Sequence, residues 1–322
     1  MAPEVSKDIA AAAKLIESGA LVAMPTETVY GLAGDATNAE AIARIYETKQ
    51  RPQFNPLIAH VSGIEMARSI AHVPALAEKL CDAFWPGPLT LVLERTEHCP
   101  VASLASAGLS SIAIRAPRHP MARQLIEAVV RPLVAPSANP SGTISPTRAS
   151  HVVKSFEKGV AMILDGGPCA IGVESTIIKI ADDTITMLRP GGVSLEALEE
   201  TVQTPILVPT DQQTIEAPGM LESHYAPRAT LRLNVREPAD DEAYLAFGPA
   251  ETGIRAHKQC LNLSPAGDLR EAAANLFAHL HALDAICTKY GLSGIAAATI
   301  PNDGLGLAIN DRLSRAAAPR SR

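Results

Sequence analysis

The feature that most constrains the fold is an alternation of short apolar runs with amphipathic stretches over the first two hundred residues. Residues 21–24 form an apolar run that ends at Pro25, and Asn38 then caps a stretch whose apolar residues recur at helical spacing. Further strand-like runs lie at residues 56–61, 89–93, 112–114, 133–135, 161–164, 176–180 and 184–188. Strands interleaved with helices predict an α/β domain, and Asp182-Asp183 between the last two runs predicts an antiparallel hairpin in a mixed sheet.

The pattern changes between residues 204 and 228, which show no clear period. This stretch holds four spaced prolines and the run His224-Tyr225-Ala226-Pro227-Arg228. Flexible spacers are rich in Gly and Ser, whereas prolines reduce the entropy that a loop loses on ordering, so we predict a linker that acts as a lid. Beyond it, strand-like and helical runs predict a second, smaller α/β domain. The predicted organisation is a larger domain at 1–203, a linker or lid at 204–228 and a small domain at 229–322.

Charge and composition limit the classes of partner. The formal net charge is −6 and aromatic residues make up 3% of the chain, which disfavours binding of long nucleic acids through a basic surface or stacked bases. None of the five cysteines is spaced as C-x-x-C, so neither a disulfide framework nor a metal site is expected. No uncharged apolar run is long enough to span a bilayer, and we expect a soluble, cytoplasmic protein without a membrane partner.

Polar side chains gather where several predicted strands end, which is where α/β folds place their ligand sites. Residues 25–32 contain Thr26, Glu27 and Thr28 directly after a strand. These side chains either bind a polar ligand or satisfy the backbone of their own turn, and their spacing alone leaves both interpretations open.

Two cations flank one residue at the end of a predicted helix. Lys49 and Arg51 either cap the helix dipole before Pro52 or clamp a phosphate, with the arginine as a fork and the lysine as a point charge. His60, at the end of the next strand, is either a core histidine or a ligand contact.

Three later strand ends carry similar signals. Arg115 closes an apolar strand and needs a carboxylate, a phosphate or a structural ion pair. Residues 135–142 form a loop of small and polar residues that lets the backbone approach a ligand, although the same residues are common in turns. Ser175 and Arg189 also stand at strand ends. The chain has no G-x-x-x-x-G-K-[ST], H-E-x-x-H or G-x-S-x-G motif.

Together these segments resemble a YrdC-type domain. Lys49-x-Arg51 and Ser137-x-Asn139 match the two signature triplets of that family, and residues 25–32 match its opening motif. Residues 84–90 and 172–176 are also similar to family runs, and the likeness covers residues 8–203. The remainder resembles the linker and additional domain of two-domain threonylcarbamoyl-AMP synthases. This resemblance implies a twisted mixed sheet flanked by helices, followed by a smaller Rossmann-like α/β domain.

The resemblance also implies a nucleotidyltransferase activity. L-Threonine, bicarbonate or CO2, and ATP would give threonylcarbamoyl-AMP and pyrophosphate, for modification of tRNA next to the anticodon. ATP would be a substrate, with Mg2+ held largely by phosphates and water. The product would pass to a tRNA threonylcarbamoyl-transferase complex, with weak or no direct binding of tRNA by this chain.

Site residues follow from the same resemblance. Lys49 and Arg51 would supply the catalytic cations. The residues implied to contact ATP are Arg51, Asn55, Ser111, Ser137, Asn139, Ser145, Arg189 and Tyr225. The residues implied to contact L-threonine are Thr28, His60, Arg115, Ala135 through its backbone, and Ser175.

Two other functions compete with this interpretation. One is an RNA- or tRNA-binding module without catalysis, which the acidic composition disfavours. The other is a carbamoyltransferase that uses a carbamoyl-adenylate, but such proteins carry an acylphosphatase segment and zinc-finger cysteines that this sequence lacks. Pyrophosphate release that requires both threonine and bicarbonate would distinguish the three.

Overall fold

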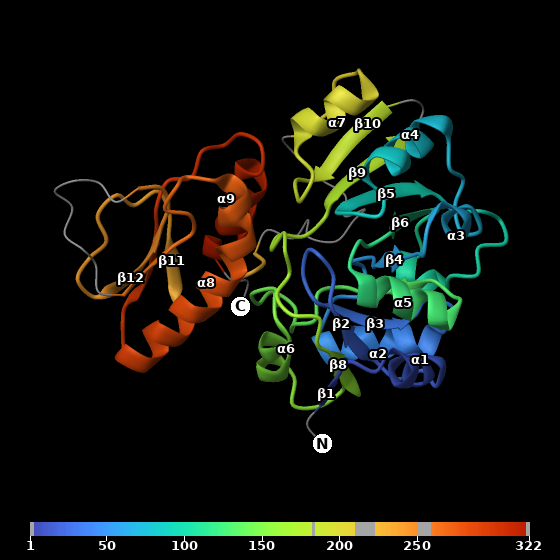
Figure 1. Ribbon diagram of the computed structural model, residues 1–322, viewed down its shortest axis with the longest axis horizontal. Helices are drawn as coiled ribbons and strands as arrows, with labels where there is room; N and C mark the ends of the chain where they lie inside the picture. The colour runs from blue at the N-terminus through green and yellow to red at the C-terminus, as the bar shows by residue number, and fades with distance from the viewer. Residues whose placement is uncertain (1–2, 182–183, 210–222, 250–258, 320–322) are drawn as a thin grey trace.

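The computed structural model describes residues 3–181, 184–209, 223–249 and 259–319, and this part of the chain forms two bodies, each built around one sheet (Figure 1). The larger sheet has the strand order β1-β8-β2-β3-β7-β4-β6-β5-β9-β10. Its strands are β1 (Glu4–Ser6), β2 (Val22–Met24), β3 (Gly31–Asp35), β4 (Ile58–His60), β5 (Leu89–Glu94), β6 (Ser111–Arg115), β7 (Leu133–Val134), β8 (Met162–Leu164), β9 (Thr176–Ala181) and β10 (Thr184–Arg189). Parallel and antiparallel pairs both occur, and β9 and β10 form the predicted hairpin, so the mixed sheet is confirmed.

Strand β3 was not expected from the sequence. It contains Gly31 and Gly34, which have low strand propensity. Antiparallel pairing with β2 on one side and β7 on the other overrides that preference, because both neighbours are already held in the sheet. The turn between β2 and β3 carries Thr26, Glu27 and Thr28, so this pairing fixes where the opening motif lies.

Helices of the larger body cover the sheet. They are α1 (Ile9–Glu17), α2 (Ala39–Lys49), α3 (Ile64–Arg68), α4 (Ala75–Phe84), α5 (Pro120–Val129), α6 (Ala149–Ser155) and α7 (Leu195–Val202). Helix α2 begins at the predicted cap, where the side chain of Asn38 accepts hydrogen bonds from the amides of Glu40 and Ala41. It ends at Lys49, and its C-cap Gln50 has a φ of 52°, which turns the chain sharply and separates Lys49 from Arg51.

The two faces of the central strands have different surroundings. Leu91, Ile114 and Ile178 point to one face and join the main core with residues of α2, α4 and α7. The alternating residues, Val92 and Ile177 among them, point to the other face and form a small separate apolar cluster. Ala113 belongs to this second face, and Arg115, two residues later on β6, points to the same face. The polar residues at the strand ends therefore lie on the face of the sheet that α2, α4 and α7 do not cover.

The smaller sheet is parallel and has the strand order β11-β14-β12-β13. Its elements are β11 (Thr230–Arg232), β12 (Glu242–Ala246), β13 (Cys260–Asn262), α8 (Leu269–Tyr290), β14 (Gly294–Ala297) and α9 (Gly306–Ala317). A large mixed sheet with a second, smaller α/β unit is the predicted fold class. The domain boundaries stay a prediction, and residues 210–222 of the expected linker lie outside the described residues.

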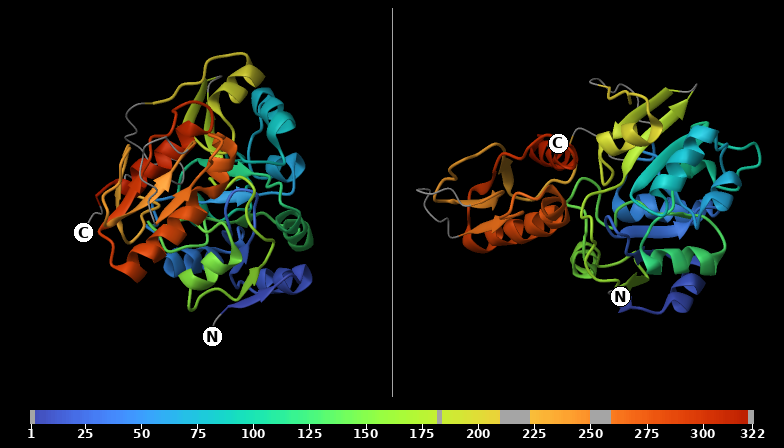
Figure 2. Two further views of the ribbon diagram at one scale, coloured as in Figure 1. Left: turned by 60° about the vertical axis from the view of Figure 1, so that its left-hand side comes forward. Right: turned by 45° about the horizontal axis from the view of Figure 1, so that its top comes forward.

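The helices of the small body, α8 and α9, lie between its sheet and the larger body (Figures 1 and 2). Val29, Ile144 and Val173 belong to the same apolar cluster as Phe277 of α8. Gly172 is part of this contact, because a Cβ at that position would overlap the backbone of α8 at Ala273 and Ala274. The two bodies therefore share one packed interface. Among the described helices, none has both the length and the hydrophobicity needed to cross a bilayer.

We expect stability to fall on acidification, in part through His151 of α6. Its ring stacks on His281 of α8 with 4.1 Å between centroids, and its Nδ1 accepts a hydrogen bond from the amide of Thr147. Burial, together with His281, Arg148 and Lys154, lowers the pKa of His151 from 6.5 to about 3. The folded state therefore holds this ring neutral, and the stability it contributes is present above pH 6.5 and lost progressively as the pH falls towards 3.

Urea unfolding of His151→Asn and of the unmodified protein, each at about pH 7 and about pH 5, tests this expectation. Asparagine keeps an acceptor for Thr147 but does not titrate, so the variant should lose less stability on acidification, by about 1.4 kcal/mol per pH unit below pH 6.5. The comparison uses pH slopes, so a constant cost of the substitution cancels. Equal slopes would contradict the role of His151.

Candidate active site

A small cavity of about 50 Å3 lies where the polar strand ends meet. Its described lining residues are Val29, Arg51, Ile58, His60, Arg115, Ala135, Pro136, Ser137, Glu174, Ser175, Arg189, His224 and Tyr225. They come from eight separate segments, including the ends of α2, β4, β6, β7 and β10. Eight of the residues predicted for the site, Arg51, His60, Arg115, Ala135, Ser137, Ser175, Arg189 and Tyr225, are thus brought together.

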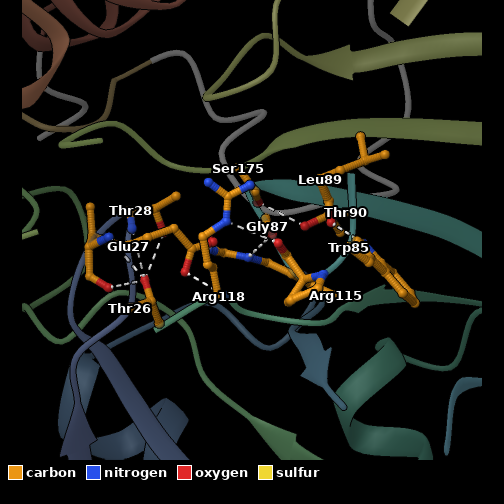
Figure 3. A network of polar contacts seen from close by, with 12 residues as sticks. Thr26, Glu27, Thr28, Trp85, Gly87, Leu89, Thr90, Arg115, Arg118 and Ser175 are labelled. Atoms are coloured by element: carbon orange, nitrogen blue, oxygen red, sulfur yellow. Dashed lines mark hydrogen bonds and ion pairs between the residues drawn. The ribbon is translucent and has the colours of Figure 1, made fainter. Parts of the chain in front are cut away.

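Arg115 is held by a buried ion pair (Figure 3). Its Nη2 lies 2.5 Å from Oε1 of Glu27, and its Nε donates to the carbonyl of Gly87 at 3.2 Å. The second carboxylate oxygen of Glu27 accepts from the amide of Arg118 at 2.9 Å. Burial alone would raise the pKa of Glu27, but Arg115 and these hydrogen bonds outweigh it and leave that pKa below its ordinary value. The structural ion pair considered from the sequence therefore exists, and it also places a guanidinium at the cavity.

The hydroxyls of the opening motif are partly used by the turn itself. Thr26 Oγ1 donates to the carbonyl of Val29 at 2.6 Å and lies 2.8 Å from Thr28 Oγ1. Thr28 is fully buried and does not line the cavity, although its neighbour Val29 does. The turn thereby presents Glu27 towards Arg115, and the predicted contact of Thr28 with threonine stays a prediction.

The two signature triplets are joined by Lys49. Its Nζ is buried and donates to the carbonyls of Ser137 and Asn139. Burial and the neighbouring Arg51 lower the pKa of Lys49 well below its ordinary value. Lys49 does not line the cavity, so the amine ties the end of α2 to the Ser137-x-Asn139 loop, and its predicted catalytic role stays a prediction.

Arg51 lines the cavity and is fixed by the loop that follows it. Its Nη2 donates to Asn55 Oδ1 at 2.6 Å and to the carbonyl of Pro56 at 2.9 Å. Burial lowers the pKa of Arg51 to about 10, which leaves the guanidinium charged at neutral pH. Asn55 Nδ2 and Asn139 Oδ1 are buried without a hydrogen-bond partner in the described part of the chain. Such atoms usually find a partner, so both are suited to contact a ligand.

Ser175 and Arg189 form a second fixed pair. Arg189 Nη2 donates to the carbonyl of Ser175 at 2.9 Å and to its hydroxyl at 3.2 Å, and this hydroxyl lies 2.7 Å from Thr90 Oγ1. Gly191 lets the two backbones approach, because a Cβ there would overlap residues 174–176. The cavity therefore has two guanidinium groups from separate segments, Arg51 and Arg189, in addition to Arg115.

His60 is a neutral imidazole. Burial and the charge of Arg115 lower its pKa from 6.5 to about 3. Its Nδ1 lies 3.1 Å from the carbonyl of Ile58, which favours a proton on that nitrogen and leaves Nε2 as an acceptor. A neutral acceptor beside Arg115 suits a ligand that carries both a carboxylate and a hydrogen-bond donor.

His224 and Tyr225 reach the cavity from the expected linker. Tyr225 has a φ of 63°. Its ring packs edge-on against His224, with 4.0 Å between centroids, and in a tilted arrangement against Phe277, with 5.5 Å between centroids. The amide of His224 donates to the carbonyl of Arg315, and that of Ala226 donates to Gly142. This short segment is therefore anchored to both bodies.

Four predicted nucleotide contacts do not line the cavity: Asn55, Asn139, Ser111 and Ser145. Ser111 lines a separate hollow of about 750 Å3 on the same sheet face, and it is four residues before Arg115 on β6, about 13 Å along the strand. Ser145 is fully buried, and its hydroxyl donates to Glu174 Oε1 at 2.6 Å. The carboxylate of Glu174 connects Ser145 to the cavity.

Comparison with known proteins agrees with this arrangement. The sequence profile of the Sua5/YciO/YrdC family, described as telomere recombination, matches residues 14–191. A profile described as threonylcarbamoyl-AMP synthase, C-terminal domain, matches residues 193–318. The threonylcarbamoyl-AMP synthase of Pyrococcus abyssi (strain GE5 / Orsay) is 40% identical over 328 residues, covering 96% of this chain and 94% of the relative. The chain belongs to the threonylcarbamoyl-AMP synthase family.

Other members of the threonylcarbamoyl-AMP synthase family agree in sequence and structure. The Bacillus subtilis (strain 168) enzyme is 39% identical and covers 97% of this chain and 93% of its own. The crystal structure of Pyrococcus abyssi Sua5 complexed with L-threonine superposes with a TM-score of 0.86 at 37% identity, covering 98% of this chain and 96% of that one.

Two charged residues at or next to the cavity, Glu174 and Arg312, were not predicted from the sequence as functional candidates. Glu174 is only 7% exposed and lines the cavity, and its position inside the family run at residues 172–176 was a signal that it is not ordinary surface. Arg312 is fully buried against Glu174, yet it lies in a helix with no recognisable motif. Its partner is 138 residues away, so no local pattern could have indicated it.

Proposed function

We infer that this chain is an L-threonylcarbamoyladenylate synthase that converts L-threonine, bicarbonate or CO2, and ATP into threonylcarbamoyl-AMP and pyrophosphate. The observation that carries this inference is the pairing of two kinds of site in one cavity. Arg115 with the neutral His60 suits the carboxylate and donors of an amino acid, while Arg51 and Arg189 suit phosphates.

The chemistry needs fixed positive charge more than a proton shuttle. The threonine amine adds to CO2 to form a carbamate, whose oxygen attacks the α-phosphorus of ATP as the bond to pyrophosphate breaks. Negative charge at the phosphorus centre is stabilised by donors that are already in place. Arg51 and Arg189 are pinned to loop carbonyls before any ligand arrives, so little reorganisation is required of them.

For threonine, we propose that Arg115 binds the carboxylate and that His60, Ser175, Thr28 and the backbone of Ala135 bind the remaining polar groups. The neutral imidazole of His60 supports this assignment, because the ring nitrogen that carries no proton can accept from the substrate. Val29 and Ile58, which also line the cavity, would contact the methyl group.

For ATP, we propose contacts with Arg51, Asn55, Ser111, Ser137, Asn139, Ser145, Arg189 and Tyr225. The unpartnered amide nitrogen of Asn55 and oxygen of Asn139 support two of these roles. Tyr225 would cover the nucleotide as part of the lid at 204–228, because its ring already occupies the cavity wall and excludes water there.

Mg2+ would enter with the nucleotide. Within the described residues, no group of three or more His, Cys, Asp or Glu side chains is placed to hold a metal, and Glu174, which lines the cavity, is already paired with Arg312. Phosphate and water oxygens would therefore be the main ligands, and the ion would neutralise phosphate charge. We further propose that the product is consumed by a tRNA-modifying transferase.

The proposed function is tested by measuring pyrophosphate release from ATP with threonine and bicarbonate supplied together or singly. Release is expected only when both are present, and mass spectrometry with 13C-bicarbonate should place the label in threonylcarbamoyl-AMP. Release that does not need threonine, or an unlabelled adenylate, would overturn the function.

Threonine should be preferred over serine by about 10- to 200-fold in kcat/KM, since that is the usual value of one methyl group in an apolar pocket. Competition assays with purified enzyme measure this ratio. Val29→Ala should reduce the ratio, because it removes apolar surface from the cavity, whereas Val153→Ala, at an exposed position on α6, should leave it unchanged. Equal kcat/KM for both amino acids would contradict a site that recognises the methyl group.

A further inference from the structure

Arg312 is the most deeply placed charge of the small body. It belongs to α9, its side chain is 0% exposed, and it is among the largest fully buried side chains of the described chain. Burying an arginine without partners would cost much of the free energy of folding, so the contacts of Arg312 indicate its role.

The guanidinium of Arg312 crosses to the larger body. Its Nε donates to Glu174 Oε2 at 2.7 Å, and its Nη2 donates to the carbonyl of Pro190 at 3.0 Å. Its central carbon lies 5.2 Å from the ring centroid of Tyr225, within the range of a cation–π contact. A side chain of the small body therefore contacts three segments that line or adjoin the cavity.

Each of these contacts leads to a residue of the proposed ATP site. Glu174 uses its other oxygen to accept from the hydroxyl of Ser145 at 2.6 Å. Pro190 directly follows Arg189, so fixing its carbonyl fixes the turn that carries that guanidinium. Tyr225 is held from one side by Arg312 and from another by Phe277.

The ionisation of Glu174 also depends on Arg312. Burial would raise the pKa of Glu174, but the opposing charges of Arg312 and Arg189 outweigh burial and leave that pKa below its ordinary value. Two further titratable groups belong to this network. Tyr225 stays protonated because burial raises the pKa of its hydroxyl, and Asp311 forms ion pairs with both Arg312 and Arg315. Glu174 is thus an anion at neutral pH, and without Arg312 it would keep only one cationic neighbour.

We propose that Arg312 is a positioning residue through which the small domain completes the nucleotide site, by orienting Glu174, the turn at Pro190 and the ring of Tyr225. The proposal rests on the function inferred above and adds to it a role for the small domain. Arg312 acts through these residues and does not itself line the cavity.

Arg312→Met tests the proposal, with Arg232→Met as the matched control. Arg232 also forms an arginine–carboxylate pair in the small domain, with Glu242, but it is exposed and remote from the cavity. Arg312→Met should raise the KM and the Kd for ATP by about 10- to 100-fold, while the KM for threonine changes by less than about threefold. Arg232→Met should leave both substrate constants unchanged.

A pH profile separates positioning from general loss of structure. With Arg312 absent, the pKa of Glu174 rises, and as the pH increases its carboxylate regains a negative charge that repels the phosphates of ATP. The KM for ATP relative to the unmodified enzyme should therefore increase with rising pH in Arg312→Met. In Glu174→Gln/Arg312→Met the ratio should stay raised and independent of pH, because the carboxylate of Glu174 is gone and Asp311, the other carboxylate paired with Arg312, keeps Arg315. The melting temperature of this double variant should lie closer to that of the unmodified protein.

If Arg312→Met does not fold, the double variant carries the test. The proposal is overturned by an ATP Kd within about threefold of the unmodified value in the variant that folds, or by equal losses for ATP and threonine. Calorimetric binding of ATP needs no turnover. An unmodified enzyme that binds ATP but makes no threonylcarbamoyl-AMP would therefore refute the proposed function and leave the role of Arg312 measurable.

Discussion

Arg51→Ala is expected to reduce threonine-dependent pyrophosphate release by about 10²- to 10³-fold, the usual effect of removing one preorganised donor from a developing charge. Arg51 is 7% exposed and lines the cavity, and its guanidinium remains charged at neutral pH although burial lowers its pKa to about 10. Single-turnover kinetics at saturating ATP would place the loss in the chemical step. Arg51→Lys should recover only part of the rate, because an ammonium lacks the planar fork.

The control for Arg51→Ala is Arg95→Ala. Arg95 is likewise tied to a loop carbonyl, with its Nη2 donating to Val101 at 2.7 Å, but it does not line the cavity. Both variants remove an arginine that braces a loop, so a comparable loss of melting temperature is expected from each, with loss of activity in Arg51→Ala alone. Near-normal pyrophosphate release by Arg51→Ala would remove the phosphate clamp from the mechanism.

Glu27→Ala should lower the free energy of unfolding by about 3–5 kcal/mol, because it leaves Arg115 as a buried cation without its partner. The ion pair joins side chains that are 7% and 4% exposed. Loss of the carboxylate also leaves the amide of Arg118 without its hydrogen-bond acceptor. Urea unfolding measures the loss. Because the carboxylate of threonine would approach the same guanidinium, saturating threonine should restore more stability to the variant than to the unmodified protein.

An exposed ion pair provides the comparison for Glu27→Ala. Arg68 and Glu78 lie at the same N–O distance, 2.5 Å, but their side chains are 45% and 40% exposed. Water already solvates both charges, so Glu78→Ala should barely change the free energy of unfolding. A similar loss from both substitutions would show that burial does not decide the strength of the Glu27–Arg115 pair.

Much of the candidate site could be predicted because ligand residues in this fold stand next to strand ends. His60, Arg115, Ser175 and Arg189 each end or adjoin a short apolar run, and the structure brings all four to one cavity. The alternation of strands and helices likewise predicted the mixed sheet and its final hairpin. Strand β3 escaped detection because its two glycines carry no strand signal and its pairing comes from neighbours.

The roles of the buried charges depended on distant partners. Lys49 and Arg51 looked alike as cations at a helix end, yet the structure turns Lys49 to the carbonyls of a loop 88 and 90 residues away and Arg51 to the cavity. The left-handed conformation of Gln50 between them separates the two directions.

The sequence by itself determined most of the strands and their hairpin, the family, and most residues that line the cavity, because periodicity, caps and strand-end motifs are local properties. Only the tertiary structure decided which charges neutralise one another. Glu27 meets Arg115 across 88 residues and Glu174 meets Arg312 across 138, and in each case burial makes the pairing necessary. An ion removed from water must find its counter-ion wherever the fold places it, and no local pattern records that position.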